Sequence, residues 1–171
     1  MKLKSLKFIA VVAMGTLLPA AAIAADPVQV GTFKDWRAYT FNDPGGKICY
    51  VVSEPKKEKG NYTNRDPAYF LITHRPQGNV FDEVSVIAGY TYKKGNEPTA
   101  TIGKSQFKFY SEGDAAWVFQ KDESGLIKAM KAGATMVVKG TSSRGTLTTD
   151  TYSLSGVTAA LNKIDAECNR K

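Results

Sequence analysis

The chain has 171 residues, of which 43% are hydrophobic and 11% aromatic, and its formal net charge is +7 at pH 7. This length fits one domain better than two. So many apolar and aromatic side chains can bury a core, which excludes a disordered, collagen-like or coiled-coil protein.

The N-terminus has the pattern of a secretory signal peptide. Three lysines are followed by an apolar stretch and by A-I-A at residues 22–24, the small-x-small pattern of a cleavage site. The apolar stretch is shorter than the roughly 20 residues of a membrane-spanning helix. We therefore predict cleavage after Ala24 or Ala25 and a periplasmic, secreted or outer-envelope location, with no integral membrane insertion afterwards. Loss of three lysines and no acids leaves a net charge of +4, which is ordinary for a domain of this size.

Residues 26–171 are predicted to form a single domain of short strands and turns. Segments rich in β-branched and aromatic residues alternate with turn residues along most of this region. Residues 54–65 are polar and lysine-rich, which indicates a solvated loop. Nucleic acid is not an expected partner, because no aromatic stacking motif accompanies these lysines. The predicted strands are residues 32–41, 47–53, 68–75, 82–88, 99–102, 105–110, 115–119, 135–140 and 146–154.

Two helices complete the predicted elements. Asp122 is placed to cap a helix over residues 123–132, and Gly133 is placed to end it. Ser155 is placed to cap a second helix over residues 157–169. The second helix carries one apolar stripe, formed by Val157, Ala160, Leu161, Ile164 and Cys168.

Cys49 and Cys168 are the only cysteines of the chain. An even number of cysteines in an oxidising compartment predicts one disulfide bond; two separate buried thiols are the alternative. The bond would close a loop of about 120 residues and hold the last helix on a strand, at roughly 4–5 kcal/mol by chain entropy.

Seven to nine short strands with frequent turns predict a mainly β fold, a two-sheet antiparallel β-sandwich of the immunoglobulin-like type. One or two short helices, including the C-terminal one, would cover an edge or an end of it. An open α+β sheet is the alternative. Most of the strand aromatics are interpreted as core: Trp36, Tyr39, Tyr50, Tyr69, Phe70 and Trp117.

His74 is the only histidine, so a Ser-His-Asp or Cys-His site would have to use it. It lies within a predicted strand, and a structural histidine is the competing interpretation. The chain contains no G-x-S-x-G, HExxH, CxxC or EF-hand pattern. The sequence therefore predicts no metal site.

Residues 141–153 hold eight serine and threonine hydroxyl groups. One interpretation is the solvated face of two strands, because threonine favours strands. The other is a polar recognition surface, in which an arginine binds an anionic group through two hydrogen bonds. The residues predicted to form this surface are Ser142, Arg144, Thr148, Asp150 and Tyr152.

Several segments, in chain order, are similar to those of one known family: F-K-D-W-R-A-Y-T (33–40), G-K-I-C-Y (46–50), F-L-I-T-H-R-P (70–76), E-V-S-V-I-A-G-Y (83–90), A-A-W-V-F (115–119), A-M-K-A-G (129–133), V-K-G-T-S-S-R-G-T-L-T-T-D-T-Y-S-L-S-G (138–156) and Cys168. They resemble the invasion-associated locus B family of exported alphaproteobacterial proteins. The resemblance covers nearly the whole mature domain. It implies an envelope β-sandwich without a cofactor and an association with host-cell invasion in pathogenic members. It does not imply an enzyme, and it supplies no catalytic residues.

Three functions follow from these observations. The first is a non-catalytic envelope protein that binds another protein or a surface component through residues 141–153. The second is a periplasmic hydrolase that uses His74 with a nearby hydroxyl group. The third is a chaperone-like or stress-linked envelope factor with an exposed apolar groove. The sequence does not distinguish oligomeric states.

Overall fold

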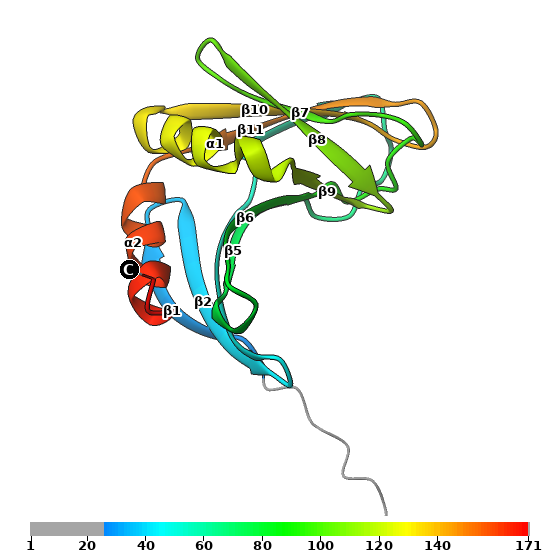
Figure 1. Ribbon diagram of the computed structural model, residues 1–171. Coiled ribbons are helices and arrows are strands. Elements are labelled where there is room, and N and C mark those ends of the chain that lie inside the picture. Colours follow the sequence, from blue (N-terminus) through cyan, green and yellow to red (C-terminus); the bar gives the residue numbers. More distant parts are fainter. Residues whose placement is uncertain (1–25, 171) are drawn as a thin grey trace, which may run out of the picture.

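The computed structural model describes residues 26–170 and is mainly β with two helices (Figure 1). The predicted signal peptide, residues 1–25, lies outside the described residues. The elements are β1 (Val28–Phe33), β2 (Trp36–Asp43), β3 (Gly46–Ser53), β4 (Lys57–Gly60), β5 (Tyr69–Arg75), a 3-10 turn (Pro76–Gly78), β6 (Val80–Ile87), β7 (Thr99–Ile102), β8 (Ser105–Glu112), β9 (Ala115–Val118), α1 (Gln120–Ala132), β10 (Thr135–Thr141), β11 (Leu147–Ser153) and α2 (Val157–Glu167).

All eleven strands belong to one sheet, in the order β1-β2-β3-β5-β6-β9-β8-β7-β10-β11-β4. Every neighbouring pair is antiparallel. Strand β8 joins the two halves, because residues 105–108 pair with β7 and residues 109–112 pair with β9. The prediction of two separate sheets in an immunoglobulin-like sandwich is therefore wrong, whereas the mainly β fold and the C-terminal helix are confirmed.

The sheet curls back on itself. Strands β3 and β4 follow each other in the chain, yet they occupy the third and the last positions of the sheet. Only residues 54–56 connect them, so the end of β3 and the start of β4 lie within about 14 Å of each other. A hydrogen bond of 3.0 Å from Trp36 Nε1 to the Ser153 carbonyl also links β2 with β11. The curl gives one sheet the two layers that the sequence predicted as two sheets.

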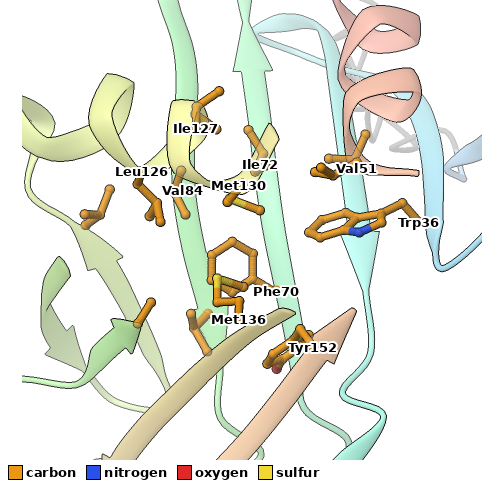
Figure 2. Close-up of a cluster of buried hydrophobic side chains, with 14 of the residues drawn as sticks. Trp36, Val51, Phe70, Ile72, Val84, Leu126, Ile127, Met130, Met136 and Tyr152 are labelled. Carbon is orange, nitrogen blue, oxygen red and sulfur yellow. The ribbon is translucent and has the colours of Figure 1, made fainter. Parts of the chain in front are cut away.

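The core fills the inside of this curl (Figure 2). The ring of Phe70 lies at its centre, 6.3 Å from Trp36, 6.4 Å from Phe109 and 5.7 Å from Tyr152, measured between ring centroids. These aromatics come from β5, β2, β8 and β11, so the core joins both halves of the sheet. Met130 of α1 is also fully buried here. Each such side chain contributes about 1.5–3 kcal/mol through its burial.

Neither helix has the predicted cap. Helix α1 begins one turn earlier than expected, after Phe119, and Asp122 lies in its first turn. Gly133 ends α1 as predicted, donating its N–H to the Ala129 carbonyl at 2.9 Å. Helix α2 is preceded by Gly156 at φ +96°, where a Cβ atom would lie 1.9 Å from the Phe33 carbonyl oxygen. Close backbone approach, which a serine cannot allow, therefore fixes the start of α2.

Four of the six aromatics interpreted as core lie instead on the opposite face of the sheet. Trp36 and Phe70 are buried in the core, but alternation along the strands directs Tyr39, Tyr50, Tyr69 and Trp117 outward, where they are half-buried. Cross-strand pairing places further large side chains beside them. We call this set the aromatic face: Tyr39, Phe41, Tyr50, Tyr69, Leu71, Ile87, Tyr110, Trp117 and Phe119.

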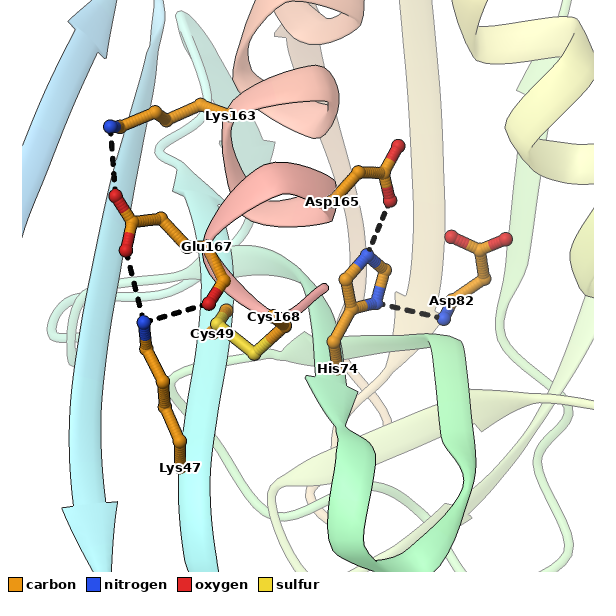
Figure 3. The surroundings of a disulfide bond; sticks show 8 residues. All are labelled: Lys47, Cys49, His74, Asp82, Lys163, Asp165, Glu167 and Cys168. Atoms are coloured by element: carbon orange, nitrogen blue, oxygen red, sulfur yellow. Dashed lines mark hydrogen bonds and ion pairs between the residues drawn. A yellow bond between two sulfur atoms is a disulfide. The ribbon is translucent and has the colours of Figure 1, made fainter. Parts of the chain in front are cut away.

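The C-terminal helix is held on the sheet by a disulfide bond between Cys49 of β3 and Cys168 (Figure 3). The two Cα atoms are 6.1 Å apart. Lys47, two residues before Cys49, donates to the carbonyl of Glu167 at 2.7 Å and to its carboxylate at 3.0 Å. The apolar stripe predicted for α2 is buried against the sheet, and Cys168 lies at its end.

The ion pairs of Glu167 should make a small, pH-dependent contribution to stability. Hydrogen bonds from Lys163 and then Lys47 hold the pKa of this carboxyl below its ordinary value of 4.5. A lowered pKa stabilises the fold above pH 4.5, and the stabilisation is lost as the pH falls through the folded-state pKa. Replacing Glu167 by glutamine should cost less than about 1 kcal/mol at neutral pH and nothing in strong acid. Thermal unfolding at neutral pH and in strong acid tests this, with Glu112→Gln as the control. An equal loss of stability under the two conditions would contradict it.

Candidate functional site

A polar cleft of about 550 Å³ opens where three connections meet at one side of the sheet. They are the β4–β5 connection, the segment after β6 and the hairpin turn between β10 and β11. We call this site the polar cleft. It is lined by Asn61, Tyr62, Thr63, Asn64, Arg65, Asp66, Gly89, Tyr90, Thr91, Ser142, Ser143, Arg144, Thr146 and Thr148.

Arg65 is the structural centre of the polar cleft. Its guanidinium donates two parallel hydrogen bonds of 2.7 Å to the carboxylate of Asp150, and its Nε donates to the Ala88 carbonyl at 2.7 Å. Both charged side chains are only 3% exposed. Burial alone would lower the pKa of Arg65, but the bonds to Asp150 outweigh it and leave this pKa above its ordinary value. The pair therefore stays charged and joins β11 to the β4–β5 connection.

Two tyrosines flank this guanidinium. Its carbon lies 5.0 Å from the ring centroid of Tyr90 and 5.8 Å from that of Tyr62, within the range of cation–π attraction. The hydroxyl of Tyr90 also forms a hydrogen bond of 2.6 Å with Thr148 Oγ1. Burial raises the pKa of Tyr90. Its phenol is therefore uncharged at neutral pH.

Backbone hydrogen bonds fix the three walls relative to one another. Asp66 N–H donates to the Gly89 carbonyl at 3.1 Å, and Ser143 N–H donates to the Thr91 carbonyl at 2.7 Å. Within the hairpin turn, Ser142 N–H donates to the Thr146 carbonyl at 2.9 Å. These bonds hold the loops that border the polar cleft against one another, which favours a preformed site.

Gly89 occupies a position in the wall that no other residue fits. Its φ is +70°, and a Cβ atom there would lie 1.9 Å from the Asp66 carbonyl oxygen. Replacing Gly89 by alanine should lower the free energy of unfolding by about 3 kcal/mol, through backbone strain and the clash together. Gly95 is the matched control, because its φ is +75° and nothing lies within 4 Å of its Cβ position. Urea titrations should show a clearly smaller loss for Gly95→Ala; equal losses would rule out the clash.

The five residues predicted to share one recognition surface are divided between the polar cleft and the interior. Ser142, Arg144 and Thr148 line the cleft, but only Arg144 is exposed. Asp150 lies behind the cleft in its pair with Arg65, and Tyr152 is fully buried in the core beside Phe70. The β11 strand directs its alternate polar side chains inward, which its composition does not reveal.

Within the described residues, neither ring nitrogen of His74 is hydrogen-bonded to a hydroxyl group. It is fully buried in β5, and its Nε2 lies 2.8 Å from Asp165 Oδ1. Its Nδ1 accepts a hydrogen bond of 3.1 Å from the backbone N–H of Asp82 (Figure 3). An accepting Nδ1 places the proton of the neutral ring on Nε2, from which it is donated to Asp165. This arrangement fits the interpretation of His74 as a structural histidine. It lacks the serine or threonine partner that the hydrolase hypothesis requires.

The comparison with protein-family models shows to which family the chain belongs. The model described as Invasion associated locus B (IalB) protein matches residues 36–165, from the start of β2 almost to the end of α2. The chain belongs to this family. The IalB match covers the core, the polar cleft and His74. Comparisons with curated proteins and with solved structures found no match.

Two further properties of the IalB domain bear on its function. Neither described helix has the length and apolar character that crossing a bilayer demands. Between residues 26 and 170, no three His, Cys, Asp or Glu side chains are grouped so that they could hold a metal ion.

Sequence reasoning missed Arg65 and Tyr90, which build the cleft. The spacing of 85 residues between Arg65 and Asp150 carries no local signal.

Proposed function

We propose that this protein is exported to the cell envelope and acts there as a non-catalytic binding protein, with the polar cleft as its contact site. The observation that carries the proposal is a preformed cleft of about 550 Å³ whose walls are held together by a buried ion pair. Such a charged pair costs desolvation, so it is weak evidence for stability and better understood as a device that fixes a particular geometry. The Cys49–Cys168 bond accords with an oxidising compartment.

The cleft supports binding better than chemistry. Its side chains are hydroxyl, amide and phenol groups, together with Arg144 and Asp66 as exposed charged groups. The only histidine lies outside the cleft lining, with both ring nitrogens engaged. A partner that is a protein or a surface component of the envelope would therefore be held without being converted. The association of the family with host-cell invasion is the setting in which such binding would matter in pathogenic relatives.

Crosslinking in intact cells followed by mass spectrometry tests this function without a prior guess about the partner. Arg144→Ala and Asn64→Ala remove exposed groups of the cleft, and both should lose the captured partner while thermal unfolding stays unchanged. Lys104→Ala is the control, because Lys104 is exposed on the β7–β8 turn, outside the cleft lining. Capture that is equal in all three variants would reject the cleft as the contact site. Asp150 is not a suitable position for this test, because its replacement would break the pair with Arg65.

The aromatic face favours a second candidate, a chaperone-like envelope factor that holds apolar polypeptide segments. Tyr110 is 49% exposed and stacks on Trp117 at 5.8 Å between ring centroids, and Tyr39 stacks on Tyr50 at 5.2 Å. The wild-type protein should then delay the aggregation of a heat-denatured client enzyme. Tyr110→Lys should weaken this effect and Leu147→Lys should not, because Leu147 is also a large, exposed hydrophobic residue (60%) but lies outside this face. No delay by the wild-type protein would end this candidate.

A further inference from the structure

The polar cleft is unusual in the chemistry of its wall. Each of its side chains that reaches solvent carries a hydrogen-bonding group, and no aliphatic side chain lines it. Ligand sites for apolar or drug-like molecules are lined mainly by hydrophobic side chains. Hydroxyl and amide groups both donate and accept, so this wall matches a ligand whose surface is dense in groups that do the same.

The charges of the polar cleft balance. Arg65 and Asp150 neutralise each other behind the wall, and the carboxylate of Glu58, outside the lining, lies 3.8 Å from the same guanidinium. Arg144 and Asp66 are both exposed, and within residues 26–170 neither forms an ion pair. A polyanion such as a nucleotide triphosphate or a nucleic acid needs several available cations. One available guanidinium suits a ligand with no acidic group or with a single one, which it can hold by two hydrogen bonds.

A peptide is also a poorer match than its polarity suggests. Extended peptides bind by pairing with a sheet edge and by placing alternate side chains in pockets. The edge strand nearest the cleft is β4, where Lys57, Glu58 and Lys59 are exposed, and such charged edges disfavour strand addition. The cleft offers no apolar pocket to receive a side chain.

From this wall and this charge balance, we infer that the polar cleft binds a saccharide that is neutral or carries one acidic group. The inference rests on the proposed function and names the class of surface component that the cleft holds. Asn64 and the hairpin hydroxyl groups would bond to ring hydroxyls of the sugar, and Arg144 would hold the acidic group where one is present. Tyr62, half-buried at the rim, supplies a ring against which a sugar can pack.

Two sources supply saccharides of this chemistry, and the experiment separates them. Isothermal titration calorimetry would use the protein without its predicted signal peptide. The ligands are the disaccharide of N-acetylglucosamine and N-acetylmuramic acid for the bacterial wall, and sialyllactose for host-cell glycans. Each carries one carboxylate; N,N′-diacetylchitobiose and lactose are the neutral counterparts. Saturable binding of at least one of the four supports the inference, and the arm that binds identifies the source.

The variants assign the binding to the cleft. Arg144→Ala should weaken the binding of an acidic saccharide by roughly tenfold or more, as expected for a lost hydrogen bond to a charged group. It should change the affinity for the neutral counterpart little. Asn64→Ala should weaken both, and Lys104→Ala neither. No binding of any of the four, or binding that Arg144→Ala and Asn64→Ala both leave unchanged, would overturn the inference.

Failure of the saccharide inference is distinguishable from failure of the proposed function. A protein partner crosslinked in cells, and lost in Arg144→Ala and Asn64→Ala, would keep the cleft as a binding site while excluding a saccharide as its ligand. Capture in cells that is independent of both residues, together with no saccharide binding, would remove both proposals.

Discussion

Replacing Asp150 by asparagine should lower the free energy of unfolding by about 3 kcal/mol, because the variant loses the paired hydrogen bonds to the buried guanidinium of Arg65 and leaves it only the partly exposed carboxylate of Glu58, 3.8 Å away. The two side chains are each 3% exposed, so solvent cannot take over the role of the carboxylate. Urea titration followed by circular dichroism measures the change. The same variant should loosen the polar cleft, since Arg65 holds two of its walls together.

Two comparisons make the Asp150 prediction specific. Arg144→Ala removes an exposed charge six residues away and should stay within about 0.5 kcal/mol of the wild type. The double variant Arg65→Met/Asp150→Leu removes both charges together and should recover part of the lost stability. An Asp150→Asn protein as stable as Arg144→Ala would show that the charged pair is not buried as the structure has it.

Removing the disulfide bond by Cys49→Ala and Cys168→Ala together should cost about 4–5 kcal/mol, because the bond closes a loop between residues 119 positions apart. In the chain-entropy account most of this cost arises in the unfolded state, which becomes less restricted. Guanidinium titrations of the wild type with and without reductant should give the same difference. The unfolding transition should keep its cooperativity.

Lys47→Ala serves as the control for the disulfide variant. It removes the hydrogen bonds to Glu167 at the same contact between β3 and the end of α2 but leaves the covalent link in place. Its cost should be under about 1 kcal/mol, as for other partly exposed ion pairs. A Lys47→Ala loss as large as that of the double cysteine variant would mean that local contacts, and not the crosslink, stabilise this end.

The sequence was sufficient for features that have a local or compositional signal. The apolar stripe of α2 follows the helical period, and the pairing of two cysteines follows from their number. Most strands were located because β-branched and aromatic residues concentrate in them. β4 was predicted as a loop, because K-E-K-G has no preference for a strand and becomes one only beside the edge of β11.

The arrangement of the sheet and of the cleft depends on contacts between distant residues. Seven to nine short strands with frequent turns favoured a two-sheet sandwich, yet the strands form one curled sheet. One face of β3 and β5 meets the core, and the other forms part of the aromatic face. Asp150 was predicted on the recognition surface as part of the hydroxyl-rich segment 141–153, but its side chain is buried. Only its partner Arg65, 85 positions away, makes its burial tolerable.

The curl of the sheet sets the order in which a growing or emerging chain can become native. β4 is finished early, but the only strand it pairs with, β11, begins 87 residues after β4 ends, at Leu147. β4 must therefore wait for its partner strand until nearly the whole chain is available, and Phe70 of β5 must wait equally long for Tyr152 of β11. Such dependence on distant partners predicts slow folding. A chain truncated before β11 should be a target for holding factors and proteases rather than a smaller stable domain.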